Sequence, residues 1–203
     1  MSEIAKIEQQ IMELSFKLNE LRKNNEEMEV PNYNFETSYG NVSLKQLFGK
    51  KDKLLLIHNM GQGCRYCTLW ADGINAFLPH LESKISVTLA SKDDPEVQNK
   101  IAHDRGWRFR MVSHQNNDYL KEQRVYKSDG DGVNHPGISC FTLKDEKIYR
   151  KNYSSFGPGD SFCSFWHLIS LAGEDANSFT PQFSYWEKPK KCHMEDGGSG
   201  YAD

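Results

Sequence analysis

The chain has 203 residues, of which 37% are hydrophobic and 12% aromatic, so it can bury the core of one globular domain and is not intrinsically disordered. The formal net charge of −3 excludes the strongly basic surface that nucleic-acid-binding proteins present. No apolar run is long enough for a membrane-spanning helix.

Cysteine usage and the N-terminus favour a cytoplasmic protein. Residues 1–6 contain the charged residues Glu3 and Lys6 and do not open the apolar core of a signal peptide. The five cysteines form an odd set with one close pair, which is a poor framework for structural disulfides. In a reducing compartment such a pair is more often used for redox or metal chemistry.

Residues 3–29 are predicted to form an amphipathic helix. Apolar residues recur at alternating spacings of three and four, as at the a and d positions of a coiled coil; they are Ile4, Ile7, Ile11, Leu14, Leu18 and Leu21. Two interpretations stay open. The stripe packs on its own domain, or it pairs with a second copy of the chain to form a homodimer. Pro31 is predicted to end the helix, because it disfavours helical backbone at Val30.

The next segment is predicted to contain a strand pair, a helical turn and a buried strand. A Tyr-Gly-Asn turn at 39–41 separates the two short strands. Ser43 is a candidate N-cap of the helical turn, and Gly49 follows its end. Residues 53–58 contain an unbroken apolar run, which fits a central strand buried on both faces.

The middle of the chain is predicted to alternate helices and strands. A helix over 65–82 presents one apolar face, and Pro79 predicts a kink or an early end in it. A strand follows at 85–90. A second helix begins at the Asp-Asp-Pro-Glu run of 93–96 and stops at Gly106, before an extended piece at 107–112.

Residues 113–137 are rich in turn-forming residues, with a short helix near Tyr119. Strands at 138–143 and 148–153 are predicted to form an antiparallel hairpin across a turn at 144–147. A last helix is expected over 160–172, closed by Gly173. Beyond it periodicity is lost, and 195–200 resembles a flexible tail.

This order of elements predicts an α/β fold. A strand–helix–strand unit requires parallel strands and a right-handed crossover, and the hairpin makes the sheet mixed, with helices on both faces. This is the thioredoxin-like three-layer arrangement. We therefore expect an N-terminal amphipathic helix (1–30), a thioredoxin-like domain (31–173) and a C-terminal extension with a flexible tail (174–203).

Cys64 and Cys67 are the candidate catalytic residues. They follow the central strand and a loop containing Gly61 and Gly63, at the first turn of the next helix. Free N–H groups and the positive end of the helix dipole favour a thiolate there, and Arg65 can add positive charge. One helical turn separates the two cysteines, so they can form a disulfide. We predict an exposed nucleophile at Cys64 and a buried resolving thiol at Cys67.

Two other interpretations of the pair are possible from its residues. A structural zinc site needs four ligands, usually from two such pairs, but there is no second Cys-x-x-Cys and the seven histidines are scattered. No metal and no cofactor are therefore expected. Inert buried thiols are the other alternative, since free cysteine often packs as a small hydrophobe. The position of the pair between strand and helix argues against it.

Other chemistry-bearing residues are expected to have lesser roles. Cys140 and Cys163 are predicted core residues, and Cys192, beside His193, is incidental. His58 could tune the thiol, although a simple strand-end residue is the commoner case. Trp70 is predicted to pack in the core.

The segment 54–73, with residues 42–48, 105–109 and 137–153, resembles an uncharacterised bacterial family of thioredoxin-like proteins, a domain of unknown function distantly related to thioredoxins and peroxiredoxins. The resemblance covers about residues 10–185. It implies the fold firmly and the activity only loosely, since a fold does not fix function.

The chain departs from both distant relatives. Thioredoxins carry Trp-Cys-Gly-Pro-Cys, whereas Gly63 precedes the pair here and Arg-Tyr fills it. Their cis-proline directly precedes the strand that faces the cysteines; that place falls near Ile138 here, and Pro136 lies two residues earlier. Peroxiredoxins have Pro and Thr shortly before the reactive cysteine, and residues 57–63 contain neither.

The sequence thus predicts a thiol–disulfide oxidoreductase without a prosthetic group, acting on a protein or small-molecule disulfide and regenerated by a reductant protein. Neither a nucleic acid nor a membrane is expected as a partner. One alternative is a non-catalytic thioredoxin-fold binding or scaffold module with vestigial cysteines. The other is a thiol peroxidase that uses Cys64.

Overall fold

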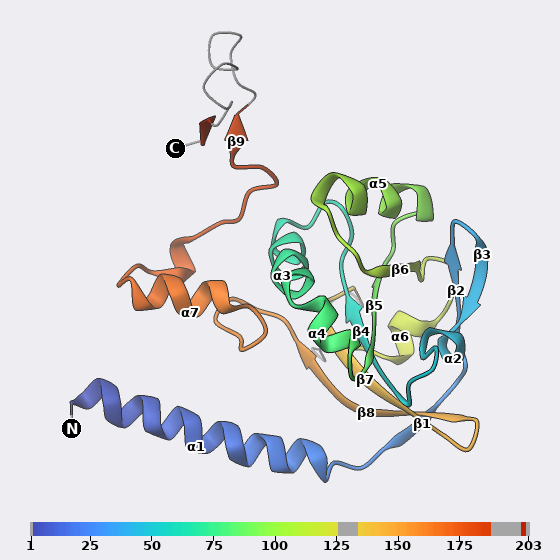
Figure 1. Cartoon of the computed structure of the whole chain (residues 1–203), viewed down its shortest axis with the longest axis horizontal. Coiled ribbons are helices and arrows are strands. Elements are labelled where there is room, and N and C mark those ends of the chain that lie inside the picture. Colours follow the sequence, from blue (N-terminus) through green and yellow to red (C-terminus); the bar gives the residue numbers. More distant parts are fainter. Residues whose placement is uncertain (1, 126–133, 188–199, 202–203) are drawn as a thin grey trace.

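A computed structural model describes residues 2–125, 134–187 and 200–201 and is shown in Figure 1. Its centre is a mixed eight-stranded sheet of order β1-β8-β7-β4-β5-β6-β2-β3. The strands of this sheet are β1 (Met28–Val30), β2 (Asn34–Thr37), β3 (Gly40–Ser43), β4 (Lys53–His58), β5 (Ser86–Ser91), β6 (Arg110–Ser113), β7 (Gly137–Lys144) and β8 (Lys147–Ser155). The helices are α1 (Glu3–Lys23), α2 (Leu44–Leu47), α3 (Arg65–Ala76), α4 (Leu78–Glu82), α5 (Pro95–Arg105), α6 (Tyr119–Glu122) and α7 (Ser164–Leu171).

The sheet has a parallel centre and antiparallel edges. Strands β4, β5 and β6 run parallel, and β7 lies antiparallel on the other side of β4. The predicted β7–β8 hairpin is confirmed. Its turn residues Asp145 and Glu146 have φ values of 46° and 69°, the left-handed backbone that tight hairpin turns require.

Strand β4 separates two apolar layers, as expected for a central strand. Leu54 and Leu56 join the core cluster that contains residues of α2 and α6. Leu55 and Ile57 point to the other cluster, built with α3, α4, α5 and α7. Because successive side chains of a strand alternate between faces, one sheet carries helices on both sides and forms the three predicted layers.

The N-terminal helix is shorter than predicted. It ends at Lys23, and Met28–Val30 instead forms β1, paired antiparallel with β8. Asn24 and Asn25 are poor helix formers, and the Asn25 side chain donates to the Lys151 carbonyl (2.8 Å) at the edge of β8. None of the residues of α1 is buried, so the first interpretation, packing of its stripe on the chain's own domain, is wrong.

The predicted helix over 65–82 divides at Phe77 into α3 and α4. Pro79 is in the first turn of α4, where a missing N–H costs no helical hydrogen bond. Two neighbouring predictions are also confirmed. Ser43 caps α2, with its side chain accepting from the Gln46 N–H, and Gly106 ends α5 in the left-handed conformation with φ of 66°.

The last helix starts later than predicted, at Ser164. Residues 157–162 form a loop because the Asp160 carboxylate accepts the N–H groups of Gly157 (2.8 Å) and Phe162 (2.7 Å). Beyond α7, Ala176 and Phe179 pack against the second core cluster. Cys192 and most of the predicted tail (195–199) lie outside the described residues. Gly200 pairs with Glu187 in a small sheet of β9 (Trp186–Glu187) and β10 (Gly200–Tyr201).

The part of the chain that the structure describes contains no helix both long and apolar enough to cross a membrane.

Candidate functional site: the cysteine pair at the start of α3

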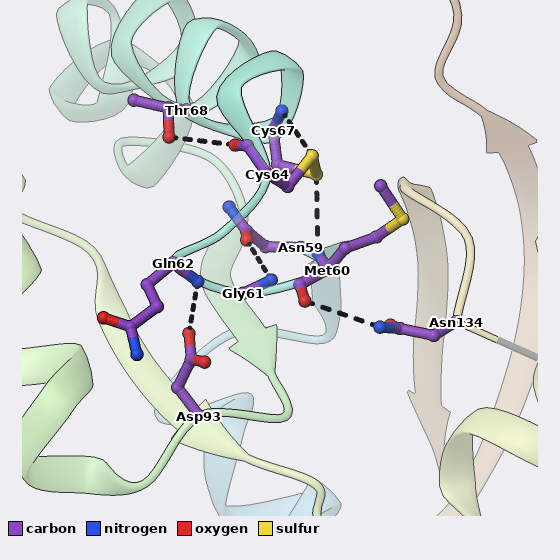
Figure 2. Close-up of a disulfide and its surroundings, with 9 residues drawn as sticks. All are labelled: Asn59, Met60, Gly61, Gln62, Cys64, Cys67, Thr68, Asp93 and Asn134. Carbon is purple, nitrogen blue, oxygen red and sulfur yellow. Dashed lines mark hydrogen bonds between the residues drawn. A yellow bond between two sulfur atoms is a disulfide. The ribbon is translucent and has the colours of Figure 1, made fainter. Parts of the chain in front are cut away.

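Cys64 and Cys67 form a disulfide at the N-terminus of α3, as Figure 2 shows. Their Cα atoms are 5.2 Å apart, one helical turn along the chain. Cys64 is the N-cap residue and is partly exposed, whereas Cys67 is buried with 3% of its surface exposed. The predicted difference in accessibility between the two sulfurs is present.

Each sulfur atom accepts a backbone N–H. The Cys67 N–H donates to Cys64 Sγ at 3.0 Å, and the Met60 N–H donates to Cys67 Sγ at 3.4 Å (Figure 2). Hydrogen bonds to a charged form stabilise it, so in the reduced protein the same donors favour thiolates. The Met60 donor is supplied by the loop and not by the helix.

The loop before Cys64 is fixed by its own hydrogen bonds. The Gly61 N–H donates to Asn59 Oδ1 and the Gln62 N–H to Asp93 Oδ2, both at 2.8 Å. Gly61 has φ of 105°, and a Cβ at this position would lie 2.7 Å from Asp93 Oδ1. Only glycine fits this backbone without strain, which explains one of the two glycines that the sequence suggested for a close approach.

Two of these partners were not predicted. Asp93 follows β5, and its sequence pattern predicts only the start of a helix. Asn134 donates through Nδ2 to the Met60 carbonyl at 3.4 Å, just before β7 (Figure 2). No local pattern signals this contact, because Asn134 and Met60 are 74 positions apart in the sequence.

Helix α3 is fastened to α5 through Asp72. Its carboxylate is ion-paired with the Arg105 guanidinium and accepts the Trp107 indole N–H at 2.7 Å. The Arg105 Nε–H also donates to Asp72, at 2.9 Å. These contacts explain the Arg-Gly-Trp motif of 105–107: Gly106 turns the chain so that both side chains reach the same carboxylate.

Trp70 of α3 belongs to a buried aromatic cluster. Trp70, 2% exposed, stacks on Phe156 with ring centres 5.6 Å apart, and its indole N–H donates to Asp160 at 3.0 Å. The predicted packing role of Trp70 is confirmed. Arg65 is exposed, and its guanidinium lies 5.5 Å from the ring centre of Phe183 in the C-terminal segment.

His58 belongs to the opposite face of β4 from α3. Its Nε2 is hydrogen-bonded to the Tyr119 hydroxyl at 2.7 Å, within the layer that contains Leu54 and Leu56. Burial, aided by the positive charge of Arg150, lowers the pKa of His58 to about 3. The ring is therefore neutral at physiological pH, and the simpler interpretation as a strand-end core residue holds.

Neither of the other two described cysteines belongs to the site. Cys163 is buried, as predicted, but caps α7 instead of lying within a helix. Cys140 is a strand residue that is only half-buried, so its assignment to the core was wrong. Burial raises the pKa of both thiols.

The proline before β7 is placed differently from the prediction. Strand β7 begins at Gly137, so Pro136 and not Ile138 directly precedes it. The described residues contain no cis peptide bond, and the Pro136 carbonyl accepts the Phe156 N–H at 2.9 Å. The thioredoxin-type cis-proline is thus missing from the described chain.

Metal ligands do not gather at this site. Across residues 2–125, 134–187 and 200–201, no three or more His, Cys, Asp or Glu side chains are placed to hold a metal ion.

Comparisons with known proteins identify the fold and the family. A yeast mitochondrial 1-Cys peroxiredoxin is 17% identical, with a TM-score of 0.50 over 80% of this chain and 82% of that chain. The peroxidoxin BcpB from Mycobacterium tuberculosis is 14% identical, with a TM-score of 0.51 over 77% of this chain and 98% of that chain. At these identities the likeness shows the fold alone, and it confirms a thioredoxin-like fold. No curated protein matches the chain. The family described as "Bacterial protein of unknown function (DUF899)" matches residues 2–190, and the chain belongs to this family.

Proposed function

We propose that the protein is a thiol–disulfide oxidoreductase whose reacting atoms are the sulfurs of Cys64 and Cys67. The observation that carries the proposal is the disulfide at the N-terminus of α3, with a partly exposed outer sulfur and a buried inner one. An N–H donor directed at each sulfur supports it further, because these donors stabilise the thiolate that attacks or leaves.

The reaction proceeds in two exchange steps from the reduced protein. The Cys64 thiolate attacks one sulfur of a substrate disulfide, forms a mixed disulfide and releases one substrate thiolate, which takes up a proton. The Cys67 thiolate then attacks Cys64 Sγ, forms the intramolecular disulfide and releases the second substrate thiolate. The substrate gains two electrons and the protein loses two.

Regeneration of the dithiol needs an external reductant. We assign this role to a reductant protein that attacks Cys64 Sγ, because the inner sulfur is buried. We also propose a cytoplasmic location, where thiol pools can keep the pair reduced. The substrate class is a disulfide in a protein or in a small molecule.

A trapping experiment in cell lysate tests the proposal. Cys67→Ser is expected to accumulate mixed disulfides through Cys64, because the resolving thiol is missing. Cys64→Ser should trap none, and Cys163→Ser, which removes a buried thiol far along the chain, should behave as wild type. Absence of any adduct on Cys67→Ser would contradict the exchange mechanism.

The same variants separate the two alternatives. In a binding or scaffold module the thiols of the folded, reduced protein would resist alkylation and Cys67→Ser would trap nothing. In a thiol peroxidase, stoichiometric peroxide would rapidly oxidise Cys64 to a sulfenic acid. The Thr68 hydroxyl does not favour a peroxide site. Its proton is donated to the Cys64 carbonyl at 3.1 Å and is therefore not available to a bound peroxide.

A further inference from the structure

Helix α1 presents an apolar face that is not buried by other described parts of the chain. The stripe defined by Ile4, Ile7, Ile11, Leu14, Leu18 and Leu21 is exposed throughout, from 44% at Leu18 to 72% at Ile4. In Figure 1 the helix extends from β1 along one side of the molecule, away from the sheet. A helix of this length, about 32 Å, takes most of its stability from packing of its apolar face. We therefore expect another apolar surface to pack against this face of α1.

We propose that α1 pairs with α1 of a second copy of this chain as an antiparallel two-stranded coiled coil. Ile4, Ile11 and Leu18 occupy a positions, and the other three stripe residues occupy d positions. In antiparallel order, Ile4 meets Leu21 of the second copy, Ile7 meets its Leu18, and Ile11 meets its Leu14. Every layer then combines one isoleucine with one leucine, in a single register that uses the whole stripe.

A parallel pair is less well matched. It would place isoleucine against isoleucine at both a and d positions in the N-terminal half of the helix. That pattern shifts parallel coiled coils towards three or four strands. Leucine would meet leucine in the other half, so the layers would be unequal along the helix.

The charges beside the stripe select the antiparallel order. Glu3 and Lys17 are at g positions, and Glu8 and Arg22 are at e positions. Antiparallel pairing sets Glu3 beside Lys17 of the second copy, and Glu8 beside its Arg22. Parallel pairing would instead join g to the following e, which brings glutamate to glutamate and Lys17 to Arg22. The helix is therefore complementary to itself only when reversed.

Lys17 gives the cleanest test of direction. It is exposed, whereas the Arg22 guanidinium already lies 5.8 Å from the ring centre of Phe162. Lys17→Glu turns an attraction into a repulsion in the antiparallel pair, and a repulsion into an attraction in a parallel pair. The two orders therefore predict opposite changes in affinity.

The first measurement is sedimentation of the full, reduced chain at low salt. We expect a dimer with twice the mass of the 23.4 kDa chain. Ile11→Glu, which buries a charge in the central layer, should weaken the dimer by more than about hundredfold. Phe16→Glu is the matched control, since it adds the same charge to the same helix outside the stripe, and it should leave the dimer intact. The stripe is not part of the domain core, so folding can be checked independently by circular dichroism.

The second measurement uses charge reversal. Lys17→Glu should weaken the dimer by about tenfold at low salt, and Glu3→Lys together with Lys17→Glu should restore it. A tighter dimer in Lys17→Glu would overturn the antiparallel order. A monomeric wild type, a dimer indifferent to Ile11→Glu, or a dimer lost in Phe16→Glu would overturn the use of the stripe, whether α1 is then left free or occupies another surface.

Discussion

The backbone at Gly61 holds the donor that faces Cys67. At its φ of 105° any other residue is strained, and a Cβ would also displace the Asp93 carboxylate that lies 2.7 Å away. Gly61→Ala is therefore expected to destabilise the protein by about 1–3 kcal/mol and to slow alkylation of the reduced pair, because the Met60 N–H is displaced from Cys67 Sγ. Urea unfolding and a thiol-labelling time course measure the two effects.

Gly63 provides the control for this prediction. It lies in the same loop, but its backbone is not left-handed and a Cβ would meet nothing within 4 Å. Gly63→Ala should change stability by about 0.5 kcal/mol or less. Equal effects of the two substitutions would show that the conformation of Gly61 is not what positions the donor.

His58 makes stability depend on pH in a defined direction. The pKa of His58 is about 3 in the folded protein and 6.5 without burial. Between pH 3 and pH 6.5, therefore, the unfolded chain binds a proton that the folded protein does not bind. The contribution of neutral His58 to the free energy of unfolding is complete above pH 6.5. It is lost as the pH falls from 6.5 towards 3, by up to about 1.4 kcal/mol per pH unit. His114, whose pKa burial also lowers, adds to the same trend.

Replacing His58 tests this directly. His58→Gln keeps a polar group beside the Tyr119 hydroxyl but cannot titrate. Between pH 7 and pH 5 the variant should lose about 2 kcal/mol less stability than wild type in urea unfolding. As a control, His103→Gln on the exposed surface of α5 should lose as much stability between pH 7 and pH 5 as wild type does. An unchanged acid sensitivity in His58→Gln would contradict the buried, neutral ring.

Among the elements, the contact of α3 with α5 depends on Asp72. Asp72→Ala leaves the indole N–H of Trp107 without its acceptor. Trp107 is only 8% exposed, so water cannot readily replace that acceptor. We expect a loss of about 1–3 kcal/mol in unfolding free energy. Asp104→Ala, which removes only the exposed pair with Lys100, should lower the unfolding free energy clearly less than Asp72→Ala does, because solvent screens that pair. Similar losses would mean that Asp72 is an ordinary surface charge.

The sequence could predict those elements whose signal is local. The apolar run at 54–57 and the turn at 145–146 predicted β4 and the β7–β8 hairpin because burial and turn chemistry are read over a few residues. The strand at Met28–Val30 was missed because only its pairing with β8 makes it a strand. The helix predicted over 160–172 starts too early, because no local pattern marks the contact of Asp160 with Trp70, 90 positions away.

The same distinction applies to the site. The three-residue spacing of Cys64 and Cys67, and their position between the central strand and the next helix, predicted that the two lie together at a helix start. The loop contacts with Asp93 and Asn134 join segments far apart in the sequence, and no spacing rule encodes them. The face to which His58 points likewise depends on how β4 is placed in the sheet.

At the scale of the whole molecule, the sheet topology explains why these segments meet. Strands β4 and β5 are parallel, so the loops after them open at one edge of the sheet. Strand β7 is antiparallel to β4, and therefore the residues before it reach the same edge. In open α/β sheets, binding sites lie outside the carboxyl ends of the parallel strands, and the disulfide occupies that position here.

A redox titration with mass spectrometric readout tests the proposed exchange chemistry most directly. The protein is equilibrated in buffers of graded thiol–disulfide ratio, alkylated and mapped by peptide. We predict a single two-electron transition confined to Cys64 and Cys67, with a midpoint within the range of exchange proteins, about −270 to −120 mV, and unchanged in Cys163→Ser. A pair that remains fully reduced or fully oxidised across the series, or a transition that involves other cysteines instead, would contradict it.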